Sequence, residues 1–321
     1  MGGRELVGES RAHRQVIETL DRVAATDAEV LITGPSGVGK ELYARYLHDR
    51  SARACKPFVA VNCGSLSAEL LENELFGHAS GAFTSAGEQR DGLAHAANHG
   101  TLFLDEVDAL PPNSQVKMLR FIQDKEFRRV GDHQLRRADV RFVAATNSDL
   151  VRAVRDGRFR EDLFFRLRVI PVSIPALRDR IEDIEPLVVR FIAQYATQYR
   201  LRPVVLSEAA QASMNTYDWP GNIRELENCV RYLTCIQLAR AIEPEDLPLI
   251  ARPLPQPSAP RSFRQAKQEV VAEFERERLV SALERAGGNI AAAARAEGKA
   301  RRAFFELLRK YGIDPERYRP S

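Results

Sequence analysis

Short apolar runs alternate with amphipathic stretches through the first part of the chain. A short run rich in Val, Ile, Leu and Phe and bounded by turn residues is typical of a strand that is buried on both faces. Strands of this kind, separated by helical stretches, predict a parallel sheet with helices on both faces. The five predicted strands are Glu29–Thr33, Phe58–Asn62, Thr101–Leu104, Val140–Thr146 and Ile170–Ile174.

The pattern changes twice further along the chain. From about Arg178 to Leu247 it is wholly helical, which predicts a smaller α-helical subdomain after the α/β one. Residues 248–262 contain five prolines, and such a segment cannot form a helix or a central strand. We therefore predict an α/β subdomain, a helical subdomain, a Pro-rich linker and a C-terminal domain, with boundaries at 1–173, 174–247, 248–262 and 263–321.

Composition narrows the class of protein without naming its function. Hydrophobic residues make up 44% of the 321 residues and charged residues 28%, which is typical of a globular protein and excludes disorder throughout. No apolar run approaches the roughly 20 residues of a membrane span, and the N-terminus has no apolar signal segment. The four cysteines form no C-x-x-C pair, so we expect a reducing cytoplasm.

The net charge of +3 is unevenly distributed. Residues 261–321 carry 14 Lys and Arg against 9 Asp and Glu, so the C-terminal domain is basic and the rest nearly neutral. A basic terminal domain favours a nucleic-acid partner, but an ordinary solvated helical surface has the same charge. On charge alone, both interpretations stay open.

A glycine-rich turn follows the first predicted strand. Gly34 to Lys40 fits the pattern G-x-x-x-x-G-K and leads directly into a predicted helix, Lys40–Arg50, which is the context this motif requires. Glycines allow backbone N–H groups to point at phosphate oxygens, and the helix N-terminus adds positive potential. The Lys40 ammonium is expected to bind the β- and γ-phosphates. The predicted phosphate loop consists of Gly34, Pro35, Ser36, Gly37, Val38, Gly39, Lys40 and Glu41, the last of which stands where many such loops have Ser or Thr.

Two acids, Asp105 and Glu106, emerge at the carboxyl end of a predicted buried strand. We predict that Asp105 holds Mg²⁺ and that Glu106 orients and deprotonates the attacking water, which favours a hydrolase over a nucleotide switch. Polar residues also end two other strands. Asn147 is interpreted as a functional residue beside the γ-phosphate, whereas Asn62 stays open between a functional residue and a turn residue.

Three longer motifs are more specific. Glu74–His78 reads ELFGH and leads into Gly81–Ala86, which reads GAFTSA; Phe159–Leu167 reads FREDLFFRL; and Trp219–Asn228 reads WPGNIRELEN. From about residue 6 to residue 247 the chain resembles the AAA+ activators of sigma-54 RNA polymerase, also called bacterial enhancer-binding proteins. The resemblance implies a AAA+ P-loop NTPase fold with an α-helical lid. It also implies a hexameric ring that uses ATP and Mg²⁺.

The resemblance also implies roles for individual residues. Arg160 and Arg166 match arginines that reach the γ-phosphate of the neighbouring subunit, and a structural salt bridge is the alternative for each. An arginine supplied by a neighbour raises phosphoryl-transfer rates by about 10³–10⁵-fold, and contacts of this head-to-tail kind close into rings. Further implied site residues are Asn62, which would hold Glu106 in an idle state, Thr146 and Asn147 in the sensor I segment, Arg224 in the lid, and Val7 near the adenine.

The loop Gly81–Ala86 departs from the family's usual GAFTGA at one position. The resemblance implies that Phe83 and Thr84 touch sigma-54. Ser85 stands where the family usually has glycine, and a serine loses the freedom to adopt positive φ. We therefore expect a loop that still presents Phe83 and Thr84 but whose coupling to hydrolysis, or whose binding to sigma-54, is altered.

The C-terminal domain has the pattern of three short helices. They are Glu273–Arg285, Asn289–Ala296 and Ala300–Tyr311, with Gly287–Gly288 and Glu297–Gly298 as the breaks. This predicts a helix-turn-helix, and it resembles the Fis-type DNA-binding domain of the family. The predicted DNA-binding residues are Lys299, Arg301 and Arg302. A helical dimerisation hairpin is the alternative.

The sequence thus predicts a transcriptional activator that binds upstream enhancer DNA and uses ATP hydrolysis to remodel sigma-54 RNA polymerase holoenzyme. The five residues before Leu6 leave no room for a receiver domain, so we expect control by a partner protein, by expression level or by a part outside this sequence. Two alternatives remain. One is a DNA-bound regulator that keeps the ATPase fold but no longer engages sigma-54, and the other is a AAA+ motor of replication or repair.

Overall fold

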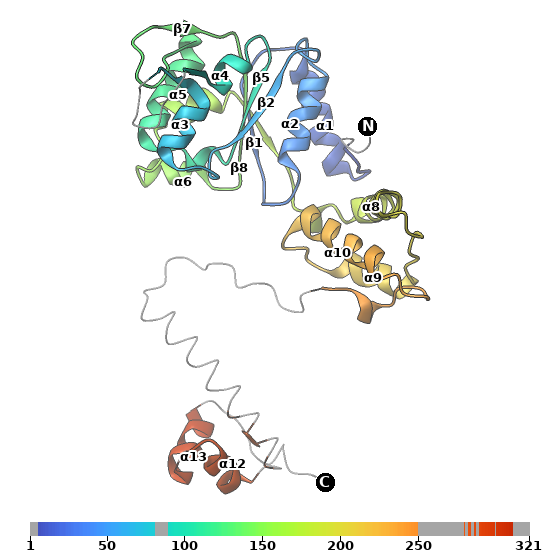
Figure 1. Ribbon diagram of the computed structural model, residues 1–321. Coiled ribbons are helices and arrows are strands. Elements are labelled where there is room, and N and C mark those ends of the chain that lie inside the picture. The colour runs from blue at the N-terminus through green and yellow to red at the C-terminus, as the bar shows by residue number, and fades with distance from the viewer. Residues whose placement is uncertain are drawn as a thin grey trace. The chain divides into compact units, whose positions relative to one another are not determined.

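The computed structural model of the chain describes residues 6–80 and 89–249 and, nearer the C-terminus, residues 279, 282–283, 286, 289–298 and 300–310 (Figure 1). The chain divides into two compact units, Met1–Ala251 and Arg252–Ser321. Among the helices of the described residues, none is both long enough and apolar enough to cross a lipid bilayer.

A five-stranded parallel sheet forms the centre of the first unit. Its strands are β1 (Val30–Thr33), β2 (Phe58–Asn62), β5 (Thr101–Asp105), β8 (Arg141–Thr146) and β9 (Ile170–Ser173). They lie in the order β2-β5-β8-β1-β9, and every neighbouring pair is parallel. These are the five predicted strands, so the predicted α/β fold with a parallel sheet is confirmed.

Helices cover both faces of this sheet (Figure 1). Alternate strand residues point to opposite faces. Ile32 therefore packs with Leu20 and Leu47 on one face, and Leu31 packs in the core of the other. The first face is covered by α1 (Arg11–Ala24) and α2 (Lys40–Asp49), and the second by α3 (Ala68–Phe76), α4 (Leu93–Ala96), α5 (Pro112–Asp124), α6 (Leu150–Arg155) and α7 (Glu161–Leu167).

Two small hairpins accompany the second face and were not predicted. One pairs β3 (Gly77–His78) with β4 (Arg90–Asp91), and the other pairs β6 (Glu126–Phe127) with β7 (Arg136–Arg137). Each strand has only two residues, and most of these are charged or polar. The apolar alternation on which strand prediction depends is therefore missing.

A helical lid follows the sheet. Its helices are α8 (Ile184–Tyr199), α9 (Glu208–Thr216) and α10 (Asn222–Ile236). Leu187, Phe191, Trp219 and Leu226 belong to a hydrophobic core of the lid's own, distinct from the two cores beside the sheet. The predicted helical subdomain is confirmed.

The second unit contains α12 (Ile290–Ala296) and α13 (Arg301–Lys310). Asn289 caps α12, because its side-chain Oδ1 accepts hydrogen bonds from the N–H groups of Ala291 and Ala292. Phe304 and Leu308 of α13 are buried in a core shared with α12. Most of the first predicted helix, Glu273–Arg285, lies outside the described residues.

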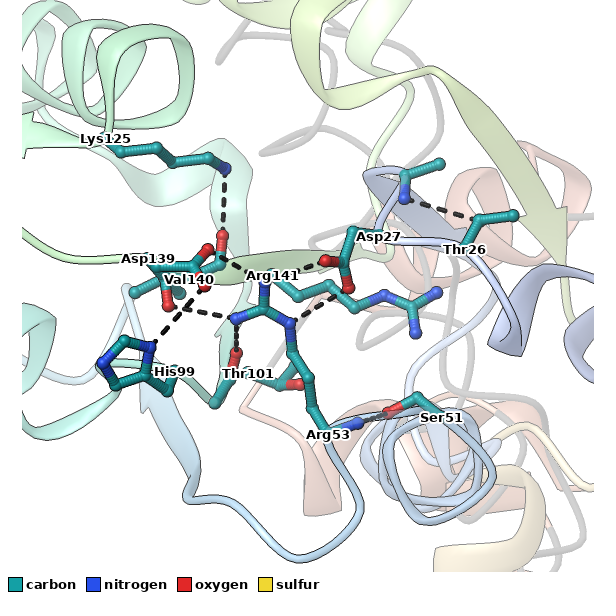
Figure 2. Close-up of polar contacts among 12 residues, drawn as sticks. Thr26, Asp27, Ser51, Arg53, His99, Thr101, Lys125, Asp139, Val140 and Arg141 are labelled. Carbon is teal, nitrogen blue, oxygen red and sulfur yellow. Dashed lines mark hydrogen bonds and ion pairs between the residues drawn. The ribbon is translucent and has the colours of Figure 1, made fainter.

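An arginine clamp ties the amino-terminal edge of the sheet together (Figure 2). The Arg53 guanidinium donates to both carboxylate oxygens of Asp27 at 3.0 and 2.8 Å and to the Asp139 carboxylate at 2.9 Å. It also donates to the carbonyls of Gly100 and Asp139, just before β5 and β8. The Arg53 side chain is only 11% exposed, so these hydrogen bonds replace its contact with water.

We expect Arg53→Met to lower the free energy of unfolding at pH 7 by about 1–3 kcal/mol, as hydrogen bonds to charged groups are lost. We expect a loss of stability near the lower end of this range, because the side chains of Asp27 and Asp139 are 61% and 57% exposed. Hydrogen bonds from Arg53 lower the pKa of both carboxyls. Their contribution is therefore present above about pH 4 and is lost as the pH falls through the folded-state pKa values.

Urea unfolding at pH 7 and at about pH 3 checks this expectation. The difference between wild type and Arg53→Met should shrink at the lower pH. The control is Arg22→Met, because Arg22 is highly exposed and lies 3.7 Å from its Glu18 partner. An Arg53→Met protein as stable as the control at pH 7 would contradict the role of the clamp.

Candidate nucleotide site

A cavity of about 410 Å³ lies at the carboxyl end of the sheet. Parallel strands bring their carboxyl ends to one edge, where polar loop residues meet. The cavity is lined by Ser36, Gly37, Gly39, Lys40, Glu41, Leu42, Arg45, Asp105, Glu106, Asn147, Arg224 and Glu227. The structure thus brings together residues that the sequence analysis placed in separate motifs.

The phosphate loop has the backbone that its glycines predict. Gly37 and Gly39 have φ of +79° and +91°, which other residues rarely adopt. The Lys40 ammonium donates to the carbonyls of Gly34 and Pro35 at 2.9 and 3.1 Å. Val38 is fully buried in the core beneath the loop, so only its main chain is available to a ligand.

The charged groups of the site are partly removed from water. Burial lowers the pKa of Lys40, while the Asp105 and Glu106 carboxylates oppose that shift. Burial also raises the pKa of Asp105, against the N–H of Glu106 and the charge of Lys40. A cation bound beside Asp105 would favour its ionised form, and carboxylate oxygen is a ligand that suits Mg²⁺. The residues present therefore fit a magnesium nucleotide.

Glu106 has an unusual backbone. Its φ is 53° and its ψ is 47°, in the left-handed region that non-glycine residues seldom occupy. Its carboxylate lies beside Gly64, where a Cβ would come within 2.3 Å of Glu106 Oε2. Asn62 is paired in register with Asp105, and its Oδ1 accepts a hydrogen bond from the N–H of Gly64 at 2.8 Å. Asn62 and Glu106 therefore meet at the same glycine.

Asp108 is a further polar residue near the site, and it was not predicted from the sequence. Its carboxylate accepts hydrogen bonds from the hydroxyls of Thr146 and Ser148, the residues on either side of Asn147. Asp108 follows Glu106 by two residues. That spacing is the signal that could have found it, since a third acid so close to the strand end stands out. Asp108 thereby connects the loop after β5 to the loop after β8.

Three predicted site residues, Val7, Arg160 and Arg166, lie away from this cavity. Val7 packs against the lid core and lines a separate, open groove with Glu9 and the outer face of α8. Arg160 directly precedes α7, Arg166 lies on it, and both are exposed. Arg160 forms an ion pair with Asp162 at 2.7 Å. Neither arginine contributes to the lining of the cavity in the described part of its own chain.

The predicted contacts with macromolecules fall mostly outside the described residues. Phe83, Thr84 and Lys299 lie there, as does the side chain of Arg301. Arg302 is exposed on α13, and its Nε donates to Glu306 one turn later at 3.4 Å. The DNA-binding residues remain predictions.

Comparison with known proteins decides the family. The model described as "Sigma-54 interaction domain" matches residues 6–173, over half of the chain. The chain belongs to the sigma-54 activator family. A AAA+ ATPase lid domain matches residues 178–262, and the family described as "Bacterial regulatory protein, Fis family" matches residues 270–303. This member of the sigma-54 activators is therefore a AAA+ ATPase and a transcription regulator with a helix-turn-helix domain.

Individual relatives agree with that membership. The transcriptional regulatory protein ZraR of Klebsiella oxytoca is 44% identical over 303 residues, which cover 94% of this chain and 68% of ZraR. The alginate biosynthesis regulatory protein AlgB of Pseudomonas aeruginosa is 52% identical over 234 residues, covering 73% of this chain and 52% of AlgB. NtrX of Brucella abortus, solved with ADP, has a TM-score of 0.76 and 38% identity, covering 97% of this chain and 70% of NtrX.

Proposed function

We propose that this sigma-54 activator binds upstream DNA through its C-terminal domain and hydrolyses ATP to remodel sigma-54 RNA polymerase holoenzyme, which allows open-complex formation. The observation that carries the proposal is the cavity that unites Lys40, Asp105 and Glu106 in a chain of this family. The location that suits such a protein is the cytoplasm, where its DNA is.

The residues of the cavity divide the work of hydrolysis. Bound ATP with Mg²⁺ supplies the phosphoryl group that water attacks. The phosphate loop and Lys40 would hold the β- and γ-phosphates, and Asp105 would hold the metal. Glu106 would take the proton of the attacking water, while Asn147 would orient a phosphate oxygen. Arg224 reaches the same cavity from the lid and adds positive charge.

The exposed arginines support a ring. Arg160 and Arg166 are absent from the cavity lining of their own chain within the described residues, yet the family motif assigns them to phosphate. Both facts are explained if each arginine reaches the nucleotide cavity of a neighbouring protomer. We propose a closed homo-oligomer, a hexamer, in which each site is completed by the next protomer.

An open-complex assay with sigma-54 polymerase, ATP and promoter DNA tests the proposed function. Wild type should give open complexes, and Thr84→Ala should give at most about a tenth as many. Its ATPase rate should stay within about twofold of wild type, because the proposed role of Thr84 is contact with sigma-54 and not ATP hydrolysis. Undiminished open complexes from Thr84→Ala would remove the loop from the mechanism.

Ser85 motivates the second candidate function, a DNA-bound regulator that no longer engages sigma-54. In that case wild type is silent in the open-complex assay despite active hydrolysis, and Ser85→Gly restores open complexes. ATP-dependent DNA unwinding by the wild type would instead favour a replication or repair motor.

A further inference from the structure

Three consecutive carbonyls of the phosphate loop accept hydrogen bonds from the lid and its entry segment. Asn222 Nδ2 donates to the carbonyl of Ser36 at 2.8 Å. The Arg224 N–H donates to the carbonyl of Gly37 at 3.2 Å. Arg180, in the turn that leads into α8, donates from Nη2 to the carbonyl of Val38 at 3.4 Å. The back of the loop is thus held by groups more than 140 residues away in the sequence.

These contacts determine where the loop's N–H groups point. In a planar trans peptide, the carbonyl of one residue and the N–H of the next point in opposite directions. A donor that holds the Ser36 carbonyl on the lid side therefore directs the Gly37 N–H away from the lid donor. A loop that binds phosphate through its N–H groups needs this orientation, because each carbonyl turned toward the phosphate would repel it.

Asn222 is the residue best placed to impose this orientation. It is 3% exposed, and besides holding Ser36 it accepts a hydrogen bond on Oδ1 from the Leu177 N–H at 2.9 Å. The two partners fix the amide's orientation, since only the NH₂ end can donate and only the oxygen can accept. Asn222 therefore joins the phosphate loop, the entry to the lid and the start of α10.

The backbone around Asn222 is built for close approach. Its φ is 54°, a left-handed value that asparagine tolerates better than most residues. A Cβ on Gly37 would come within 2.2 Å of the Gly221 carbonyl, so the loop and the first turn of α10 touch main chain to main chain. Arg180 is equally fixed, because it is buried and donates to the Tyr43 hydroxyl at 3.0 Å.

We propose that Asn222 is a positioning residue for the nucleotide phosphates: it fixes the phosphate loop from the lid side before nucleotide binds. The inference rests on nucleotide binding at this loop and extends it, because it makes the lid part of the loop's own structure. Coupling free energies are reciprocal. A nucleotide that requires the fixed loop therefore also stabilises the docked lid.

Asn222→Asp tests the proposal, because aspartate has nearly the same shape and keeps the acceptor for Leu177. It replaces the donor to Ser36 with a carboxylate oxygen that faces a carbonyl. Two readouts are used: hydrogen exchange of the ligand-free protein, and the dissociation constant of a fluorescent N-methylanthraniloyl ADP. We expect amides of residues 36–40 to exchange about tenfold faster and the dissociation constant to rise about tenfold.

The matched control is Asn228→Asp on the same helix. Asn228 is exposed and, among the residues that the structure describes, its side chain accepts a hydrogen bond from Arg231 alone, so both readouts should stay within about twofold of wild type. A purely structural role for Asn222 would speed exchange throughout the lid core, whereas the proposal confines the change to the phosphate loop. KM for ATP should rise with little change in kcat, as expected when binding alone is weakened.

The outcomes separate this inference from nucleotide binding itself. Wild type that fails to bind the ADP analogue contradicts nucleotide binding, while the exchange experiment still tests Asn222. Unchanged exchange at residues 36–40 in Asn222→Asp overturns the inference. Should that variant fail to fold, Asn222→Gly tolerates the left-handed backbone and removes the side-chain hydrogen bonds to Ser36, Pro220 and Leu177. The same changes are expected for exchange at residues 36–40 and for the dissociation constant.

Discussion

Glu106→Gln is expected to reduce the steady-state rate of ATP hydrolysis by about 10²–10⁴-fold, the usual contribution of a positioned general base. Glutamine has the size of glutamate, so it fits the space beside Gly64. It cannot accept the proton of the attacking water. Affinity for nucleotide should stay within about twofold, because the phosphate loop and Lys40 are unchanged. Phosphate release and binding of a fluorescent ADP analogue measure the two effects.

The matched control for this variant is Glu69→Gln, at an exposed position in the first turn of α3. It makes the same change of charge away from the cavity, and its rate should equal that of wild type. Open complexes should disappear with hydrolysis in Glu106→Gln. A variant that keeps more than about half of the wild-type rate would assign the proton transfer to another group.

Arg166→Ala and Arg160→Ala are each expected to lower the hydrolysis rate by about 10³-fold or more if the guanidinium completes a neighbour's site. Arg160 also forms an ion pair with Asp162 in its own chain, so an effect on stability is measured in parallel by thermal unfolding. The control is Arg158→Ala, since Arg158 is exposed nearby and pairs with Asp156 at 3.0 Å. It should leave the rate within about twofold.

Mixing two inactive variants decides whether the arginine acts across an interface. In a mixture of Arg166→Ala and Glu106→Gln protomers, some sites combine an intact Glu106 with an intact neighbouring Arg166. Such sites should hydrolyse ATP, so the mixture should recover activity that neither variant has alone. A mixture as inactive as its components would place the arginine in the same site as Glu106 of its own chain.

The central sheet could be predicted from the sequence because its strands are buried on both faces. Val30–Thr33 and Thr101–Asp105 are largely apolar, and the phosphate loop directly after β1 marks its end. The predicted helix Asn289–Ala296 likewise agrees with α12, which Asn289 caps. The two-residue strands of the hairpins, such as β7 (Arg136–Arg137), carry no run of apolar residues and no capping residue that would predict them. Their pairing depends on the turn between the strands and on tertiary contacts.

The site was predictable in its motifs but not in its connections. Asp105 ends β5, Glu106 follows it, and Lys40 closes the loop after β1. A parallel sheet brings residues at its carboxyl ends together. The hydrogen bonds of Asn222 to Ser36 and Leu177 join segments that are far apart in sequence, and no local pattern encodes them. Asp108 is visible in the sequence as a third acid near the strand end, but its partners are not, because Thr146 ends β8 and Ser148 lies just after it.

The left-handed backbone of Glu106 is a position where stability of the fold and the proposed catalytic role favour different residues. Glycine adopts a φ of 53° without steric cost, whereas a non-glycine residue there costs on the order of 1 kcal/mol or more. The backbone conformation alone would favour glycine at this position. Laboratory evolution that selects for thermal stability but not for ATP hydrolysis should therefore replace Glu106 early. The resulting protein should be more stable and should no longer hydrolyse ATP.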